Sequence, residues 1–420
     1  MIDKLSNINF SIPLIALFLI FIIIFPSLFL EKLYDKKLSR IRDGYRLLII
    51  FLIELILDLS LYIIIFLNSH IDVNLLIVNL LIIIIILNTI FWNGMIRVYL
   101  FSKQLGIRYR IIGLVLGIIP IAHIIMLIKI INVCKKEVIF ENEKIKLNLS
   151  RKDRLICKTK YPLLLVHGIF FRDFEKLNYW GRIPDELINN GATIYYGNHS
   201  SSLSVKDSAK ELSNRILEII NETKCEKVNI IAHSKGGLDS RYAISNLGMD
   251  KYIASLTMIN TPNHGCVFAD YLLNKAPDKF KNKVASVYNF AFKKLGDKNP
   301  DFIAGVTDLT SHTVENLNKE MKKIDKIYYK SYGSVLKKAT GGRFPLNITN
   351  NFVKLFDGKN DGLVGINSFP YGDNFELIES PYKRGISHGD VIDLNRENIE
   401  GYDVREFYVK LVNDLKNKGF

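Results

Sequence analysis

Ser234 lies in a stretch that reads KVNIIAHSKGGLDSRY, between the small residues Ala232 and Gly236. A sharp turn between a strand and a helix can expose a serine hydroxyl as a nucleophile, and small residues two positions before and after it let the neighbouring backbones approach. An apolar run before Ser234 predicts the strand, and the residues after Gly236 predict the helix. Ala232 stands where the pattern usually has glycine, and it adds only one methyl group. The setting therefore favours Ser234 as a nucleophile.

A nucleophilic serine needs a base that takes its proton and a carboxylate that orients the base. In one arrangement of the three groups the chain order is Ser, then Asp or Glu, then His. The stretch VKLFDGKNDGLVG is expected to form an apolar strand and then a turn that holds Asp361, and His388 is the only histidine beyond it. Asp357 in the same loop is the alternative acid, and Asp361 is favoured because the tight turn Asn-Asp-Gly surrounds it.

Two backbone N–H groups are expected to stabilise the negative charge that develops on a substrate oxygen. One belongs to Lys235, at the start of the expected helix. The other belongs to Ile169 in the stretch LLLVHGIFF, where Gly168 permits close approach of a substrate. Phe170 and Phe171 would make this rim apolar.

Short apolar runs alternate with amphipathic stretches in the C-terminal half, which predicts an α/β fold with a mostly parallel sheet and flanking helices. Strands are expected at 161–168, 192–197, 227–234, 253–261 and 326–335, and helices at 179–191, 205–223 and 236–248. A cap or lid is expected at about 263–325, where Phe268, Tyr271 and Leu272 have the spacing of an apolar helix face.

The N-terminal part is far more apolar, and the mean hydropathy of the whole chain is +0.14. Apolar runs at 9–30, 47–67, 73–92 and 111–131 are each close to the roughly 20 residues that cross a bilayer as a helix. We therefore expect a membrane domain with four transmembrane helices at 1–135 and a globular domain at 136–420. Glu54 and Asp58 share one helix face, either as a polar contact between helices or as part of an ion or substrate path.

Positive charge in the loops predicts how these helices are oriented. Loops 31–46 and 93–110 are rich in Lys and Arg, whereas loop 68–72 has none. Basic loops face the cytoplasm. With four spans and a first run retained as a helix rather than cleaved as a signal peptide, both chain ends and the globular domain would be extracytoplasmic.

Composition excludes several other classes of function. The net charge of +14 suggests nucleic acid, but the basic residues form no stripe interleaved with aromatic residues, so attraction to anionic lipid headgroups fits better. The four cysteines are widely spaced, which supports neither a disulfide framework nor a zinc site.

At these residues the sequence resembles the bacterial lipases of the α/β-hydrolase superfamily. The similar blocks are VHGIFFRD, NYWGRI, YYGNHSS, IIAHSKGGLDSRY, INTPNHG, NDGLVG and SHGD, in this order, within about residues 160–415. Some of these lipases also carry alanine at the position of Ala232. The resemblance implies an α/β-hydrolase fold with Ser234 as nucleophile, Asp361 as acid and His388 as base. It also implies oxyanion N–H groups from Ile169 and Lys235.

The resemblance implies no required cofactor. Related lipases hold a structural calcium ion near the histidine loop, and Asp390 matches one ligand position. The carboxylate oxygens of Asp390 are hard ligands of the kind that Ca²⁺ prefers. The alternative is that Asp390 is an ordinary turn residue that binds no metal.

The expected function is that of a membrane-anchored serine lipase or esterase that acts on lipid esters. A lipid acyltransferase would use the same acyl-enzyme. A non-catalytic membrane protein with a hydrolase-like binding domain is a further alternative, and transport through the helix bundle is a weaker one, suggested by Glu54 and Asp58.

Overall fold

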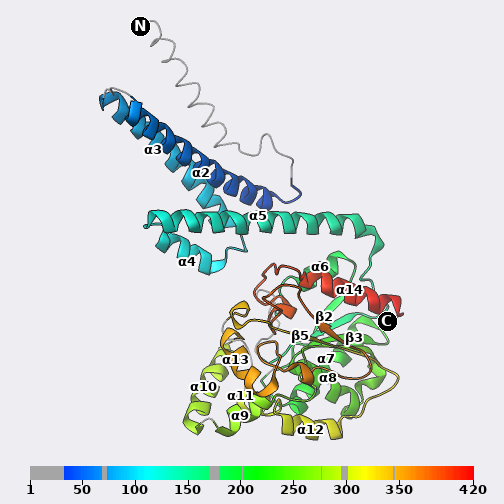
Figure 1. Cartoon of the computed structure of the whole chain (residues 1–420). Coiled ribbons are helices and arrows are strands. Elements are labelled where there is room, and N and C mark those ends of the chain that lie inside the picture. Colours follow the sequence, from blue (N-terminus) through cyan, green and yellow to red (C-terminus); the bar gives the residue numbers. More distant parts are fainter. Residues whose placement is uncertain are drawn as a thin grey trace. The chain divides into compact units, whose positions relative to one another are not determined.

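The computed structural model of the chain describes residues 33–68, 73–169, 179–200, 202–275, 277–294, 301–343 and 346–420. The chain forms two compact units, Met1–Ser150 and Arg151–Phe420 (Figure 1).

The C-terminal unit is built on a sheet of six strands in the order β2-β1-β3-β4-β5-β6. The strands are β1 (Leu163–Val166), β2 (Ile194–Tyr196), β3 (Val228–His233), β4 (Ile253–Ile259), β5 (Tyr328–Ser334) and β6 (Phe375–Ile378). Every pairing is parallel. Parallel strands need crossover connections, so their carboxyl ends all lie at one edge of the sheet.

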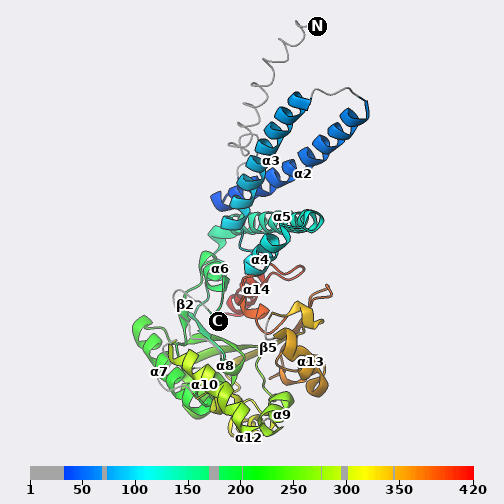
Figure 2. The same ribbon diagram turned by 90° about the vertical axis from the view of Figure 1, so that its left-hand side faces the viewer.

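Helices cover both faces of this sheet, as Figures 1 and 2 show. Leu163 and Leu165 of β1 pack in a core with α6 (Ile183–Asn189) and α14 (Val404–Asn417). Leu164 and Val166 pack in a second core with α7 (Val205–Thr223) and α8 (Lys235–Asn246). Successive side chains of a strand point to opposite faces, so a fully apolar β1 serves both cores.

Most of the expected elements of this unit are present, and α7 has the expected limits. Ser204 accepts a hydrogen bond from the Asp207 N–H and caps α7 at its first turn. The sequence reasoning missed β6 and α14.

The expected strand before Asp361 is wrong. Residues 353–356 are the last turn of α13 (Leu346–Asp357), in which Leu346, Asn350 and Val353 are buried. These residues are four and three apart, which is the spacing of one helix face. The apolar run is the end of that longer pattern.

The stretch expected as a cap or lid contains α9 (Val267–Lys275), α10 (Asp278–Lys294), α11 (Phe302–Thr307) and α12 (Ser311–Glu320). Phe268 and Tyr271 both lie on α9. Short 3₁₀ helices complete the unit: η1 (Lys152–Arg154), η2 (Met249–Tyr252), η3 (Ala339–Gly341), η4 (Ile366–Ser368) and η5 (Asp390–Ile392).

In the N-terminal unit, α2 (Lys36–Asn68) and α3 (Val73–Phe101) lie side by side (Figures 1 and 2). They approach closely at two glycines, where a Cβ on Gly44 would lie 2.9 Å from Arg97 Cβ and one on Gly94 would lie 2.8 Å from Leu48 Cδ2. Both helices are long and apolar enough to cross a membrane, over Lys36–Ile64 and Leu76–Phe101. The apolar run at 9–30 lies outside the described residues.

The fourth expected transmembrane helix, at 111–131, is not a single helix. The chain forms α4 (Gly106–Leu116), breaks, and starts again in α5 (Pro120–Arg151). Pro120 has no N–H and fits only the start of a helix, so the first helix ends before it.

The expected domain boundary at 135/136 also falls inside α5. The compact units divide at Ser150/Arg151 instead. The fall in hydropathy near residue 135 does not mark the end of α5, because charged residues such as Lys135, Glu141 and Lys144 continue a helix as well as apolar ones do.

A buried ion pair should stabilise the C-terminal unit. The carboxylate of Asp393 accepts hydrogen bonds from Arg182 N, Nε and Nη2 at 2.8, 2.7 and 2.8 Å. Asp393→Asn removes the buried carboxylate charge from this pair, which costs about 3 kcal/mol. The melting temperature, followed by tryptophan fluorescence, should fall by about 6–12 °C. Asp373→Asn, which removes an ion pair of an 86% exposed carboxylate with Lys323, is the control and should leave it nearly unchanged. An equal effect of both substitutions would contradict this.

Candidate active site

Ser234 occupies a strained turn at the carboxyl end of β3, directly before α8. Its backbone has φ 55° and ψ −133°, a conformation that a residue with a side chain rarely adopts. Its N–H donates to the Ile259 carbonyl at 3.0 Å, and its own carbonyl accepts from the Gly237 N–H at 3.1 Å. These bonds to β4 and α8 fix the turn in place.

Two glycines make this turn possible. A Cβ on Gly168 would lie 2.7 Å from Ser234 Cβ, and one on Gly236 would lie 2.4 Å from the His167 carbonyl oxygen. Ala232 is a fully buried residue of β3 that pairs with Val166 on one side. Its methyl group is accommodated inside the sheet, so the missing glycine of the sequence pattern does not disturb the turn.

His388 and Asp361 form a second element at the same edge of the sheet. His388 Nδ1 donates to Asp361 Oδ2 at 2.6 Å, and the His388 N–H donates to the Asp361 carbonyl at 2.8 Å. The other carboxylate oxygen accepts from the N–H groups of Leu363 and Val364 at 2.9 and 2.8 Å. Asp361 is fully buried, and its carboxylate is surrounded by donors.

Asn260 also orients this carboxylate, and sequence reasoning missed it. Its Nδ2 donates to Asp361 Oδ2 at 2.6 Å and to Ser334 Oγ at 2.7 Å. Its backbone has φ 49°, a region in which asparagine is several-fold enriched. An asparagine directly after the apolar run of β4 was the available signal.

The structure brings the His388–Asp361 pair to the turn that holds Ser234. The ring centroid of His388 lies 4.5 Å from that of His233, the residue before the serine. Burial, and secondly the nearby His388, hold the pKa of His233 well below its usual value, so His233 stays neutral. The His233 Nδ1 atom lies 2.6 Å from the Tyr179 hydroxyl, which accepts from the Gly168 N–H at 3.0 Å.

The two residues expected to supply oxyanion N–H groups flank the turn. Lys235 is the first residue of α8, and buried Ile169 follows Gly168, which touches the serine turn. Phe170 and Phe171, expected at the rim, lie outside the described residues.

The side chain of Lys235 is fully buried. Its Nζ donates to Asp239 Oδ1 and to Ser208 Oγ, each at 2.8 Å. Asp239 Oδ2 lies 3.3 Å from His199 Nε2, and the ring of His199 stacks on that of His167 at 4.4 Å. Burial raises the pKa of Asp239 to about 6, although the Lys235 charge opposes the shift. This chain of contacts runs from the first residue of α8 back to the loop after β1.

Asp357, the alternative acid, is engaged elsewhere. Its carboxylate accepts from the N–H groups of Val267 at 3.3 Å and Phe268 at 3.1 Å, at the start of α9. A carboxylate there satisfies N–H groups of the first helical turn.

The calcium ligand expected at Asp390 does not fit its surroundings. Asp390 Oδ2 accepts from Arg384 Nη1 at 2.6 Å and from the Ser387 N–H at 2.8 Å, and Oδ1 accepts from Arg384 Nη2 at 3.2 Å. A guanidinium therefore balances the charge that Ca²⁺ would balance. Within the described ranges, no three His, Cys, Asp or Glu side chains are grouped to hold a metal ion.

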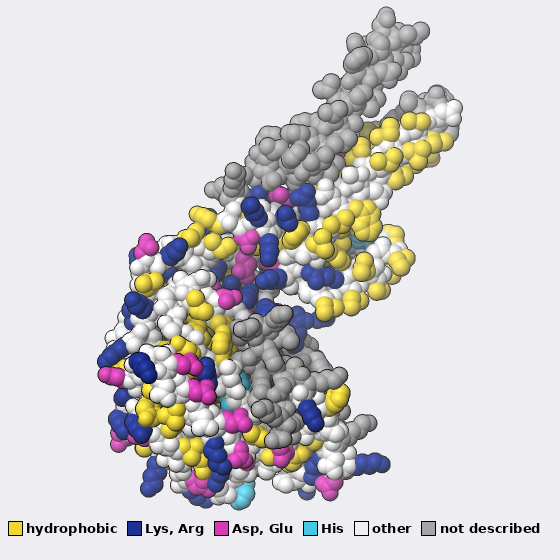
Figure 3. Space-filling view, turned by 180° about the vertical axis from the view of Figure 1, so that it is seen from behind, with side chains coloured by type: hydrophobic (Ala, Val, Ile, Leu, Met, Phe, Trp, Pro, Cys, Tyr) yellow, Lys and Arg dark blue, Asp and Glu magenta, His cyan; other side chains and the backbone are white. Residues whose placement is uncertain are grey.

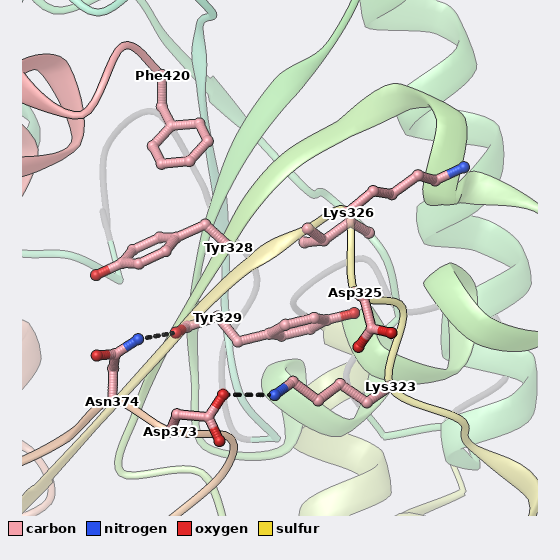
Figure 4. Close-up of a pocket in the computed structure, with 9 residues that line it drawn as sticks. Lys323, Asp325, Lys326, Tyr328, Tyr329, Asp373, Asn374 and Phe420 are labelled. Atoms are coloured by element: carbon pink, nitrogen blue, oxygen red, sulfur yellow. Dashed lines mark hydrogen bonds and ion pairs between the residues drawn. The ribbon is translucent and has the colours of Figure 1, made fainter.

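A cavity of about 380 Å³ lies at the opposite end of the strands and takes no part in this site (Figure 4). Tyr328 begins β5 and Asn374 precedes β6, so the cavity opens at the amino ends of these strands. The ion pair of Lys323 with Asp373 lines it.

Comparison with known proteins finds similarity to triacylglycerol lipases. The chain is 30% identical over 173 residues to a triacylglycerol lipase of Pseudarthrobacter phenanthrenivorans, covering 38% of this chain and 54% of that one. It is 26% identical over 296 residues to a triacylglycerol lipase of Pseudomonas fragi, covering 62% of this chain and 98% of that one. These similarities support a bacterial lipase-like α/β-hydrolase family for the C-terminal unit.

The fold of this lipase-like unit is shared with a metagenomic carboxyl esterase of known structure, at a TM-score of 0.50 and 13% identity, over 62% of this chain and 76% of that one. No family model matches the chain. The chain spans about half the length of two of the triacylglycerol lipases that it matches, 54% and 48%.

The buried Lys235–Asp239 pair predicts that the stability of a variant without Lys235 depends on pH. Without Lys235 the pKa of Asp239 in the folded state rises further above its pKa in the unfolded state. The free energy of unfolding therefore falls as the pH rises from the unfolded-state pKa to the folded-state pKa. The melting temperature of Lys235→Met should therefore be close to wild type at about pH 5 and clearly lower at about pH 8. Lys235→Met/Asp239→Leu should recover most of the loss at the higher pH. A deficit of the same size at both pH values would contradict the pairing.

Proposed function

We propose that this protein is a serine hydrolase that cleaves carboxylic esters of lipids and is held at a membrane. The observation that carries the proposal is the convergence of the strained Ser234 turn with the His388–Asp361 pair at one edge of the sheet. The similarity to triacylglycerol lipases supports the reaction class.

In the proposed mechanism, Ser234 Oγ attacks the ester carbonyl while His388 Nε2 takes its proton. Asp361 stays ionised, fixes the histidine tautomer through the Nδ1 hydrogen bond and stabilises the imidazolium. The N–H groups of Ile169 and Lys235 stabilise the oxyanion. His388 then protonates the leaving alcohol, and it activates the water that hydrolyses the acyl-enzyme.

A hydrophobic surface beside the site supports a lipid substrate. The ring of Tyr271 on α9 stacks on that of Phe356 on α13 at 4.7 Å, and both side chains are exposed. Phe352 and Leu355 on α13 are exposed as well. Both helices follow the carboxyl ends of central strands, at the edge that holds Ser234. Apolar side chains gathered in this way suit contact with lipid.

The helices α2 and α3 support membrane association. Their most apolar segments have mean hydropathies of 2.6 and 2.3, and only 11% and 6% of the residues in these segments are buried. A core helix of a water-soluble protein would bury these side chains, and soluble proteins rarely expose such a contiguous apolar surface. We propose that α2 and α3 span the membrane.

The nucleophile and the acid can be tested together. Ser234→Ala should lower ester hydrolysis by about 10⁴-fold or more, and Asp361→Asn by about 10³–10⁴-fold. Ser234→Ala should also abolish labelling by a serine-reactive phosphonate. Ser245→Ala and Asp357→Asn are the matched controls and should retain most of the activity.

Full activity of Ser234→Ala, or equal losses for the two aspartates, would refute these assignments. If the wild-type protein does not react with the phosphonate, the C-terminal unit would be a non-catalytic binding domain. Transfer of a labelled acyl group to an alcohol in place of water would indicate an acyltransferase.

The exposed aromatic surface predicts a substrate-dependent loss. Tyr271→Ser/Phe356→Ser should lower turnover of an emulsified long-chain ester by at least about fivefold, because each aromatic side chain that contacts lipid contributes on the order of 1 kcal/mol. Turnover of a water-soluble short-chain ester should change little. Ile188→Ser on α6, which also removes an exposed apolar side chain, is the control. Equal losses on both substrates would assign the pair a role in folding instead.

A further inference from the structure

The end of α3 and the middle of α5 are in contact, so the chain between them leaves this contact and returns to it. The carboxylate of Glu137, on α5, accepts from the N–H groups of Lys103 at 2.9 Å and Gln104 at 3.3 Å, and from the Ser102 hydroxyl. Glu137 is 4% exposed, so this contact lies inside the N-terminal unit. Residues 103 and 137 must therefore lie on the same side of any membrane that this unit enters.

The chain reverses between these residues as a helical hairpin. A Cβ on Gly113 of α4 would lie 3.2 Å from Ile130 of α5, and the two helices lie side by side in Figures 1 and 2. The α4 helix has 11 residues, a length of about 16 Å. It cannot cross a hydrocarbon core of about 30 Å.

The tip of this hairpin, residues 111–128, is apolar and exposed. It contains no Lys, Arg, Asp or Glu. Its exposed apolar side chains, with exposed fractions from 40% to 86%, are Ile111, Leu114, Val115, Ile118, Ile119, Ile121, Ile124, Ile125 and Ile128. Figure 3 shows hydrophobic side chains over this part of the unit.

Basic side chains mark the boundary of the tip. Arg108 and Arg110 precede it on α4, and Lys129, Lys135 and Lys136 follow it on α5. Basic residues next to an apolar element bind anionic lipid headgroups.

We propose that residues 111–128 form a re-entrant element, which enters the acyl chains of one leaflet and returns to the side from which it came. The occupant of its exposed surface is lipid, because the hairpin is continuous with α3, whose apolar part is proposed to span the same bilayer. This inference rests on the membrane association proposed above and not on the hydrolase activity.

The re-entrant element changes the expected location of the lipase-like unit. Residues 138–151 carry Glu141, Glu143, Lys144, Lys146 and Arg151, so they cannot cross the bilayer on the way to that unit. The unit therefore lies on the side of the basic end of α3, where Arg97 is 3.8 Å from Asp43 of α2. Basic ends face the cytoplasm, so the extracytoplasmic location expected from four spans is replaced by a cytoplasmic one.

Cysteine accessibility tests this topology in the full chain. Lys103→Cys, Lys135→Cys, Ile118→Cys and Asn74→Cys are introduced singly after the native cysteines are replaced. A membrane-impermeant maleimide is applied to sealed vesicles of both orientations. Lys103→Cys and Lys135→Cys should react from the same, cytoplasmic side, and Asn74→Cys from the other side. Ile118→Cys should react from neither side until detergent is added.

Reaction of Lys103→Cys and Lys135→Cys from opposite sides would overturn the re-entrant element, because the segment between them would then cross. Rapid reaction of Ile118→Cys in intact vesicles would place the tip in water and also overturn it. Release of the whole protein by alkaline carbonate would overturn the membrane association itself. Phosphonate labelling of Ser234, measured on the same samples, reports the hydrolase proposal separately.

Discussion

The backbone of Ser234 is the constraint on which the proposed site depends. Its φ of 55° is possible because β1 and β4 flank β3, so that Gly168, Gly236 and the Ile259 carbonyl all meet the turn. The same parallel order delivers Asp361 and His388 to this edge. A side chain added at either glycine would collide with atoms that the sheet holds in place, so the strain at Ser234 is maintained by the architecture as a whole.

Buried charges around this turn are stabilised by dense hydrogen bonding. Asp361 receives hydrogen bonds from His388, Asn260 and backbone N–H groups. Lys235 and Asp239 neutralise each other in a second buried cluster. A buried charge without a partner in this region would lower the free energy of unfolding. Lys235 directly follows Ser234, and His388 lies beside His233, so each cluster includes or contacts a residue next to the serine.

The N-terminal unit differs, because many of its apolar side chains are exposed although others form a buried core. The proposed contact with lipid would account for both the exposed apolar surfaces of α2 and α3 and the exposed tip of the α4–α5 hairpin. The buried contact from Glu137 to the end of α3 limits how often the described part of the unit crosses the membrane in the proposed topology. In the proposed topology, this carboxylate thus relates α3 to the compartment of the lipase-like unit.

The sequence by itself determined the features that depend on neighbouring residues: the strand and helix around Ser234, the limits of α7, and the order of Ser234, Asp361 and His388 along the chain. Local periodicity and capping carry this information. Only the tertiary structure decided the role of Asn260, the pairing of Asp390 with Arg384, and the contact that folds residues 103–137 back on themselves. The partners in these contacts are far apart or in different elements, and apolar composition alone does not distinguish a spanning helix from a hairpin. A pattern of single residues does not encode which of them meet, because packing of the whole chain selects those pairs.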